Sequence, residues 1–293
     1  MADLRGVVPA VVTPFTAEGD FNETAFREIV EHNIQAGVHG FWIGGGTGES
    51  VLLDDEENFR IATAAANQAA GRIANIMHIG APTTRRAAKM AERAASAGVD
   101  ALCCVPPFFY EADEDEIIEH YRVVASATEL PLLLYNLPQS TGVNISPTLA
   151  AKIRDKVPQV AGLKHSGPTV EHVREFSNLG LACFIGNSYL MLPGLTIGAV
   201  GCIDGPLNVV PELWVAIWRA YQEGDLSGAI EAQRHATEVA QAIYEFGFLG
   251  ALKAAASERL QIDCGPPRAP QAALGAGQRS DMVERLRALG VMP

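Results

Sequence analysis

The chain has 293 residues, of which 48% are hydrophobic and 19% charged, enough apolar material for one large folded core. Asp and Glu total 34 against 22 Lys and Arg, a formal net charge of −12, so the chain lacks a basic surface for nucleic acid. Its apolar runs are broken by Pro and Gly and fall short of the roughly 20 residues that span a bilayer. The first residues do not resemble a signal peptide, so we expect a cytoplasmic protein.

Short apolar runs alternate along the chain with segments of helical period, at intervals of roughly 25 to 35 residues. One helix is expected to begin at Asp54, because Glu57 three residues later is typical of a capping box. Three helices are expected to end at a glycine that leads into the next strand, at Gly37, Gly98 and Gly198. The predicted strands cover residues 7–13, 40–44, 73–79, 101–105, 132–135, 160–164, 182–185 and 200–203.

Eight strands that alternate with helices over about 250 residues predict an α/β fold, a (β/α)8 TIM barrel with its active site at the carboxyl ends of the strands. A doubly wound open sheet is the alternative. The pattern after Pro211 is helical only, over residues 212–223, 226–246, 249–260 and 280–289. We therefore expect a barrel in residues 1–224 and, in residues 225–293, a C-terminal helical extension of the same domain.

Cysteine and histidine spacing indicates no metal site. The five cysteines lack CxxC spacing, and four of them lie in apolar strand-like runs, which favours buried, reduced thiols over disulfides. The seven histidines are scattered and form no HExxH motif. We therefore expect neither a zinc site nor a disulfide framework.

One lysine differs from the others. Lys89, Lys152, Lys156 and Lys253 lie in amphipathic, Ala-rich segments that are typical of solvated helix faces, whereas Lys164 ends an apolar strand. Burial disfavours the charged form of an amine and leaves it available as a nucleophile. A strand-end lysine that reaches water or pairs with a carboxylate is the alternative.

The second predicted strand leads into the loop GGGTGES, residues 44–50. Glycines let backbone N–H groups approach an anion, and Thr47 adds a hydroxyl donor. The loop matches neither the dinucleotide fingerprint nor a P-loop, so we expect it to bind a small carboxylate; a tight turn without a ligand is the alternative. We expect Glu49 to be structural, with its carboxylate accepting hydrogen bonds from loop N–H groups.

Tyr135 ends the fifth predicted strand, so its hydroxyl is expected at the same end of the barrel as Lys164. A lysine that forms an imine needs a group that carries protons, and a nearby tyrosine can do this. We expect Lys164 to face both Tyr135 and Tyr110. Together with the glycine-rich loop, these residues predict Schiff-base chemistry on a 2-oxo acid. The covalent imine on Lys164 then replaces any metal or organic cofactor.

Motifs along nearly the whole chain resemble those of the pyruvate-dependent class I aldolases that include dihydrodipicolinate synthase and N-acetylneuraminate lyase. In chain order they are GVVPA, TPF, GGGTGES, YNLP, GLK and GPPR. The resemblance implies that Lys164 forms the Schiff base, that Tyr135 carries protons and that Thr47 with the neighbouring backbone amides holds the carboxylate. It places the backbone of Ile203 beside the pyruvyl group. It also implies that Tyr110 enters a neighbouring subunit's site, hence a homo-oligomer, either a dimer or a tetramer.

The chain departs from the family at three places. Gly46 stands where both named enzymes carry a hydroxyl that links two tyrosines in a proton relay. Ser140 stands where dihydrodipicolinate synthase has an arginine for its aldehyde substrate's carboxylate. Ser188 and Tyr189 stand where N-acetylneuraminate lyase has an acidic pair for sugar hydroxyls. These departures argue against both named reactions.

The remaining strand-end groups are small and mostly neutral, and we expect them to suit a hydroxylated chain. We expect a lyase or aldolase that cleaves or forms a 2-oxo-3-deoxy acid, with pyruvate as product or donor. A 2-oxo-3-deoxy sugar acid dehydratase and 4-hydroxy-tetrahydrodipicolinate synthase are the alternatives, and a non-catalytic 2-oxo acid sensor is an alternative of another class. Candidate substrate-binding residues are Gly46, Thr47, Gly48, Ser166, Gly186, Asn187, Ser188 and Ile203, with Ser140 and Asp204 nearby.

Overall fold

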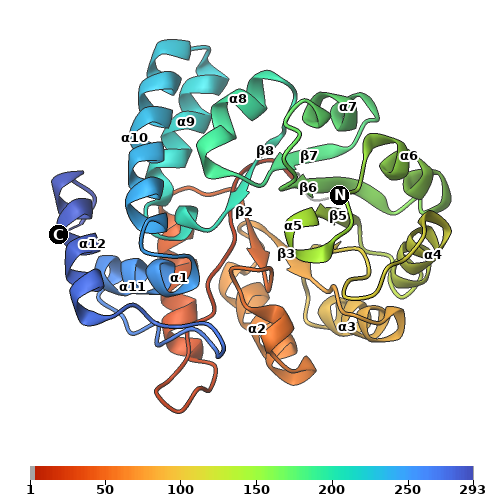
Figure 1. Cartoon of the computed structure of the whole chain (residues 1–293), viewed down its shortest axis with the longest axis horizontal. Coiled ribbons are helices and arrows are strands. Elements are labelled where there is room, and N and C mark those ends of the chain that lie inside the picture. Colours follow the sequence, from red (N-terminus) through yellow and green to blue (C-terminus); the bar gives the residue numbers. More distant parts are fainter. Residues whose placement is uncertain (1–3, 293) are drawn as a thin grey trace.

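The computed structural model describes residues 4–292, and its centre is a ring of eight short parallel strands with helices outside it (Figure 1). Hydrogen-bonded neighbours follow the order β1, β8, β7, β6, β5, β4, β3, β2. The strands are β1 (Gly6–Pro9), β2 (Gly40–Ile43), β3 (Ala74–His78), β4 (Ala101–Cys104), β5 (Leu132–Asn136), β6 (Val160–His165), β7 (Ala182–Ile185) and β8 (Gly201–Asp204).

A bridge between Ala10 and Trp42 joins the two ends of this order, and the Val11 N–H donates to the Trp42 carbonyl at 3.0 Å. The TIM barrel is therefore confirmed, and the open-sheet alternative is wrong. The first predicted strand, residues 7–13, was too long. After Pro9 the chain leaves the ladder with β8 and crosses to β2, and the Thr13 hydroxyl then donates to the Gly48 carbonyl at 2.8 Å.

Helices connect the strands, and the predicted helix signals are present in the structure. Asp54 and Glu57 form a reciprocal capping box at the start of α2. Gly37, Gly98 and Gly198 have φ of 86°, 86° and 110°, values that glycine adopts without strain. The helices are α1 (Glu23–Gln35), α2 (Asp55–Ala69), α3 (Thr84–Ser96), α4 (Glu114–Ala125), α5 (Pro138–Thr141), α6 (Pro147–Lys156), α7 (His172–Asn178), α8 (Met191–Thr196) and α9 (Pro211–Glu223), with short 3-10 turns η1 (Ser50–Leu52), η2 (Ser188–Leu190) and η3 (Pro206–Asn208).

Three further helices follow α9 along one side of the barrel: α10 (Leu226–Tyr244), α11 (Leu249–Leu260) and α12 (Ala276–Ala288) (Figure 1). The last helix begins before the predicted 280–289 because the Gln278 side chain accepts the Gly275 N–H and caps its first turn. Within residues 4–292, no helix combines the length and apolar character required to cross a membrane.

Side chains fill the barrel interior. They form a buried cluster that includes Val8, Trp42, Ile76, Leu133, Tyr135, Phe184 and Ile203, separate from the larger apolar cluster. In the sheet register Lys164 pairs with Tyr135 of β5 on one side and Phe184 of β7 on the other. Lys164 thus belongs to the inward-facing set. All five cysteines are buried and free, as predicted.

Candidate active site

Lys164 and Tyr135 lie side by side at the carboxyl end of the barrel. The Lys164 Nζ donates to the Tyr135 hydroxyl at 3.2 Å, and each residue is only 5% exposed. The same nitrogen lies 4.6 Å from the centroid of the Tyr135 ring and 5.2 Å from that of Trp42. Sequence reasoning expected this pair, and the structure places it in a buried, aromatic environment.

The loop after β2 folds so tightly that two glycines are required. Gly44 has φ of 63°, and a Cβ on Gly48 would lie 2.9 Å from the Gly44 backbone. Thr47 is 4% exposed, and within residues 4–292 neither its hydroxyl nor the Thr47 and Gly48 N–H groups have a hydrogen-bond partner. The loop thus presents unpaired donors, which suits a small anion.

Gly46 differs from its neighbours in the loop. A Cβ at this position would meet nothing within 4 Å, and the backbone does not adopt a positive φ. Gly46 also lines the same pocket as Tyr135. Where the resemblance to the two named enzymes predicts a hydroxyl-bearing side chain, position 46 therefore has open space on the pocket side.

Glu49 ends the loop in a left-handed conformation, with φ of 61°, and its carboxylate is completely buried. Its Oε1 lies 2.6 Å from the Nζ of Lys253 in α11, and its Oε2 accepts the Arg268 N–H at 2.6 Å. We expected loop N–H groups as its donors, but residues more than 200 positions away take that role. Glu49 thus joins the loop to the C-terminal extension.

The prediction that Lys253 lies on a solvated helix face is wrong. Its side chain is 1% exposed, because α11 packs on all sides through small residues such as Ala251, Ala254 and Ala255. The Nζ lies 4.0 Å from the centroid of the Phe15 ring. Burial lowers the pKa of Lys253, and the Glu49 carboxylate opposes that shift.

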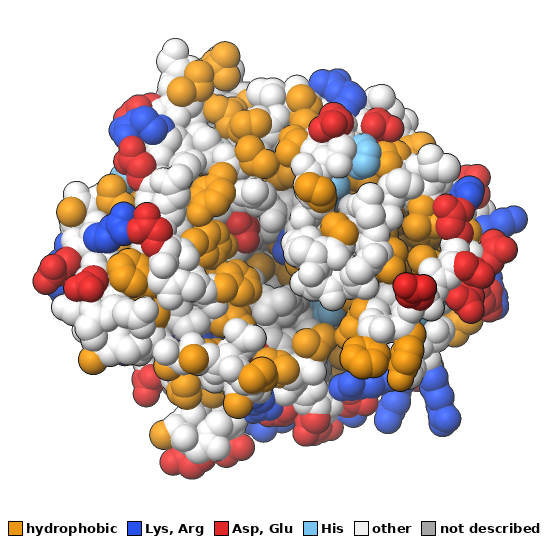
Figure 2. Space-filling view, in the orientation of Figure 1, with side chains coloured by type: hydrophobic (Ala, Val, Ile, Leu, Met, Phe, Trp, Pro, Cys, Tyr) orange, Lys and Arg blue, Asp and Glu red, His pale blue; other side chains and the backbone are white. Residues whose placement is uncertain are grey.

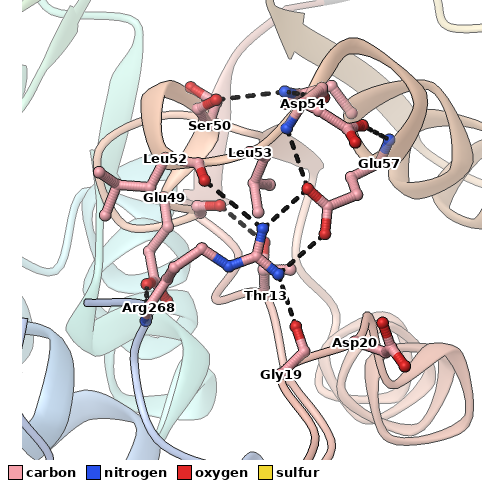
Figure 3. Close-up of polar contacts among 12 residues, drawn as sticks. Thr13, Gly19, Asp20, Glu49, Ser50, Leu52, Leu53, Asp54, Glu57 and Arg268 are labelled. Atoms are coloured by element: carbon pink, nitrogen blue, oxygen red, sulfur yellow. Dashed lines mark hydrogen bonds and ion pairs between the residues drawn. The ribbon is translucent and has the colours of Figure 1, made fainter. Parts of the chain in front are cut away.

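Arg268 makes a second connection between the extension and the loop (Figure 3). Its guanidinium binds both carboxylate oxygens of Glu57 in α2 at 2.8 Å and also donates to the carbonyls of Leu52 and Gly19. This contact lowers the pKa of Glu57. Bidentate guanidinium–carboxylate pairs impose a fixed geometry. The segment from Gly19 to the start of α2 is therefore held against the C-terminal residues.

His78 is a site residue that sequence reasoning missed. It ends β3, is 3% exposed, and its Nδ1 lies 3.1 Å from the Ser50 Oγ. Its ring centroid lies 6.0 Å from that of Tyr135. Burial, assisted by the Lys164 charge, lowers the pKa of His78 to about 4, so the ring is neutral at pH 7. A polar residue at a strand end, as at Tyr135 and Lys164, was the available signal.

A pocket of about 350 Å³ opens beside Tyr135 and His78. The glycine-rich loop forms one side of it, and the segment after β5 forms another. The start of α11 contributes Phe248 and Leu249. Figure 2 shows hydrophobic side chains around a hollow near the middle of this face.

The predicted residues after β6 and β7 lie at the same end of the barrel but are not among the residues that line that pocket. A Cβ on Gly186 would fall 1.9 Å from the Ser166 Oγ, so these two segments are in close contact. The Asn187 side chain accepts the Tyr189 N–H at 3.0 Å. Ile203 lies in the barrel interior in the same cluster as Tyr135.

Two residues expected to bind a hydroxylated chain, Ser188 and Asp204, are held within the protein. Ser188 is completely buried; its carbonyl accepts from Trp214 and Gln233, but its hydroxyl has no hydrogen-bond partner among the described residues. The Asp204 carboxylate accepts the Ser188 and Gly205 N–H groups at 2.8 Å and the Tyr244 hydroxyl at 3.2 Å. Burial and the Asp204 charge raise the pKa of Tyr244. The polar strand-end residues that the sequence predicted to bind substrate therefore have a partly structural role.

Tyr110 does not meet Lys164 within one chain. It is 78% exposed and packs against Phe109, which is 85% exposed, with ring centroids 5.0 Å apart. The expectation that Lys164 faces two tyrosines of its own chain is therefore wrong for Tyr110.

Within the described part of the chain, no group of three or more His, Cys, Asp or Glu could hold a metal ion.

Comparisons with known proteins agree with this geometry. Residues 3–289 match the model of the dihydrodipicolinate synthetase family. The chain is 35% identical to an uncharacterized DapA-like lyase of Halobacterium salinarum, covering 99% of this chain and 95% of that protein. It is 30% identical to N-acetylneuraminate lyase of Rhizobium meliloti, covering 91% and 89%.

Solved structures show the same similarity. Dihydrodipicolinate synthase from Aquifex aeolicus matches with a TM-score of 0.93 and 25% identity over 99% of each chain. CdNal from Clostridium difficile, solved in complex with mannosamine, matches with a TM-score of 0.92 and 26% identity, covering 98% of this chain and all of that one.

Proposed function

Because the chain belongs to the dihydrodipicolinate synthetase family of class I aldolases and lyases, we propose that it cleaves or forms a 2-oxo-3-deoxy acid, with pyruvate as product or donor. Enzymes of this family use a lysine Schiff base with pyruvate and no metal or external cofactor. The observation that carries the proposal is the 3.2 Å contact between the Lys164 Nζ and the Tyr135 hydroxyl.

Lys164 is the nucleophile in this proposal. Its amine adds to C2 of the 2-oxo acid and loses water, which gives an iminium. The C4 hydroxyl then gives up its proton, the C3–C4 bond breaks, and its electron pair forms an enamine as the aldehyde leaves. C3 of the enamine takes a proton, and water hydrolyses the resulting iminium to pyruvate and free Lys164. Tyr135, which touches Lys164, carries these protons.

The glycine-rich loop holds the substrate carboxylate in this proposal. Its support is the set of unpaired donors at Thr47 and Gly48, with Gly46 next to them on the pocket side. A fixed carboxylate would orient C2 toward the Lys164 amine.

The other candidate residues complete the proposed site. The side of the proposed site near β6 to β8 is formed by Ser166, Gly186, Asn187, Ser188 and Ile203. We assign Tyr110 to the site of a neighbouring copy of the chain, because its side chain is 78% exposed in a single copy. The functional unit is then a homo-oligomer. The molecule that it binds is a small 2-oxo acid substrate.

The test is a panel of 4-hydroxy-2-oxo acids, with release of pyruvate and loss of water measured separately. Pyruvate release that disappears in Lys164→Ala supports the lyase. Water loss without pyruvate release would assign the dehydratase, because elimination of the C4 hydroxyl starts from the same iminium. A panel with neither product, together with no covalent pyruvate on Lys164, would reject the proposal.

A further inference from the structure

We propose that the aldehyde partner of pyruvate in this enzyme carries an apolar substituent, aromatic or branched, which binds in the pocket beside Tyr135. This inference rests on the proposed function. It concerns the substituent on C4 of the 2-oxo acid. Cleavage or formation of the C3–C4 bond proceeds in the same way whatever this substituent is.

The walls of the pocket are largely apolar. Val105 and Phe108 follow β4, Leu137 follows β5, and Phe248 and Leu249 come from the C-terminal extension. Tyr135 lies among them with its hydroxyl on Lys164. A substituent on the aldehyde carbon, held near Lys164, would therefore contact carbon atoms from three separate segments.

Part of the polar lining of the pocket is engaged within the protein. The Ser50 hydroxyl pairs with His78, and the Thr141 hydroxyl donates to the Leu137 carbonyl at 3.0 Å. A chain of substrate hydroxyls would lose its water against the apolar walls, which is unfavourable, and the lining side chains that could replace it are the exposed Ser140 and Gln271 and the unpaired Nε2 of His78.

The pocket also offers no cationic side chain to a second carboxylate. Among the described residues that line it, none is Lys or Arg, and its one charged side chain is Glu49. That carboxylate is bound to Lys253. Ser140, which also lines the pocket, is a neutral residue at its exposed edge. An anionic aldehyde is therefore disfavoured.

Exposed apolar side chains at the pocket mouth point the same way. Val51 is 58% exposed and Phe248 is 45% exposed, and both line the pocket. Exposed apolar groups gathered at a pocket are typical of a ligand-binding surface. The volume of about 350 Å³ lies within the range of small-molecule sites and accommodates a ring-sized substituent.

The experiment measures condensation of pyruvate with three aldehydes: benzaldehyde, D-glyceraldehyde and succinic semialdehyde. Borohydride trapping of pyruvate on Lys164 is measured first, because its absence would reject the proposed function and this inference with it. With the adduct present, we expect kcat/KM for benzaldehyde to exceed that of either other aldehyde by about tenfold or more. An equal or higher value for glyceraldehyde or succinic semialdehyde would overturn the inference and leave the proposed function standing.

Two surface variants make the test independent of folding. Phe248→Gln and Val51→Gln change exposed side chains at the mouth, and Leu226→Gln is the matched control, since Leu226 is 55% exposed at the start of α10 and does not line the pocket. We expect each mouth variant to lower kcat/KM for benzaldehyde by about threefold or more relative to kcat/KM for D-glyceraldehyde. Equal effects of the mouth variants and the control would contradict the assignment.

Discussion

Lys253 of α11 and Glu49 of the loop after β2 form an ion pair at 2.6 Å in which the two side chains are 1% and 0% exposed. The pair joins the C-terminal extension to the loop assigned to the substrate carboxylate. Glu49 follows Thr47 and Gly48 directly, so the pair anchors the end of the loop that carries their donors. The extension is thus a support for the active site as well as an addition to the barrel.

Lys253→Met removes one partner and leaves the Glu49 carboxylate buried without a counter-charge. We expect the free energy of unfolding to fall by about 3–5 kcal/mol, because an unpaired buried charge is strongly unfavourable. Urea denaturation at pH 7 measures the change. The double variant Lys253→Met/Glu49→Gln removes both charges and should recover part of the loss.

The matched control is Arg279→Ala, which breaks the pair with Glu258 on the surface, where the side chains are 45% and 30% exposed. Solvent screens such a pair, so we expect a loss below about 1 kcal/mol. Similar losses for Lys253→Met and Arg279→Ala would show that the buried pair does not support the loop.

Stability should fall as the pH is lowered from 6.5 toward 4. The pKa of His78 is lowered from 6.5 to about 4 in the folded protein, and that of His120 likewise to about 4. Between these values the unfolded chain binds protons that the folded chain does not, so the free energy of unfolding decreases with falling pH. The contribution of His78 is complete above pH 6.5 and is lost by pH 4.

His78→Gln should remove its share of this dependence. We expect the variant to lose about 2–3 kcal/mol less than the parent protein between pH 7 and pH 4.5, measured by urea denaturation at both values. His120→Gln should have a comparable effect. If the free energy of unfolding of His78→Gln depended on pH as it does in the parent protein, the pKa of His78 would not be lowered by folding.

Substitution by alanine should affect the stability of the protein differently at two glycines of the carboxylate loop. A Cβ at Gly48 would fall 2.9 Å from the Gly44 backbone, whereas a Cβ at Gly46 would enter open space. We expect Gly48→Ala to cost about 1–3 kcal/mol through overpacking, and Gly46→Ala to stay within about 0.5 kcal/mol of the parent. Thermal unfolding of both variants measures this, and equal costs would contradict the loop geometry.

Tyr135→Phe separates binding from proton transfer. The ring remains to pack beside Trp42, but the hydroxyl that contacts Lys164 is lost. We expect pyruvate to bind with little change and turnover to fall by about 10²- to 10⁴-fold. Tyr121→Phe is the control, because Tyr121 is a buried phenol that donates to the Cys104 carbonyl. Parent-like turnover in Tyr135→Phe would remove its assigned role.

The strands, their order along the chain and the Lys164–Tyr135 pair could be predicted because they depend on local pattern. Apolar runs of four to six residues define the strands, and a polar residue at the end of such a run marks the open face of the barrel. His78 fits the same rule, although its significance depends on Ser50, which lies 28 positions earlier in the chain.

Long-range partners explain what the sequence could not predict. Lys253 lies in an Ala-rich helix that is indistinguishable by pattern from a solvated one, and its partner Glu49 is distant in the chain. Ser188 is buried because Trp214 of α9 and Gln233 of α10 reach its carbonyl. Neither contact has a periodic signal, since both depend on how the extension packs on the barrel.

Borohydride reduction in the presence of pyruvate, followed by peptide mass mapping, tests the central claim most directly. The chain offers two buried lysines for comparison, Lys164 beside Tyr135 and Lys253 beside Glu49. The account predicts that the peptide with Lys164 gains the mass of pyruvate less one oxygen atom, while Lys253 stays unmodified. No adduct, or an adduct that persists on another lysine in Lys164→Ala, would contradict it.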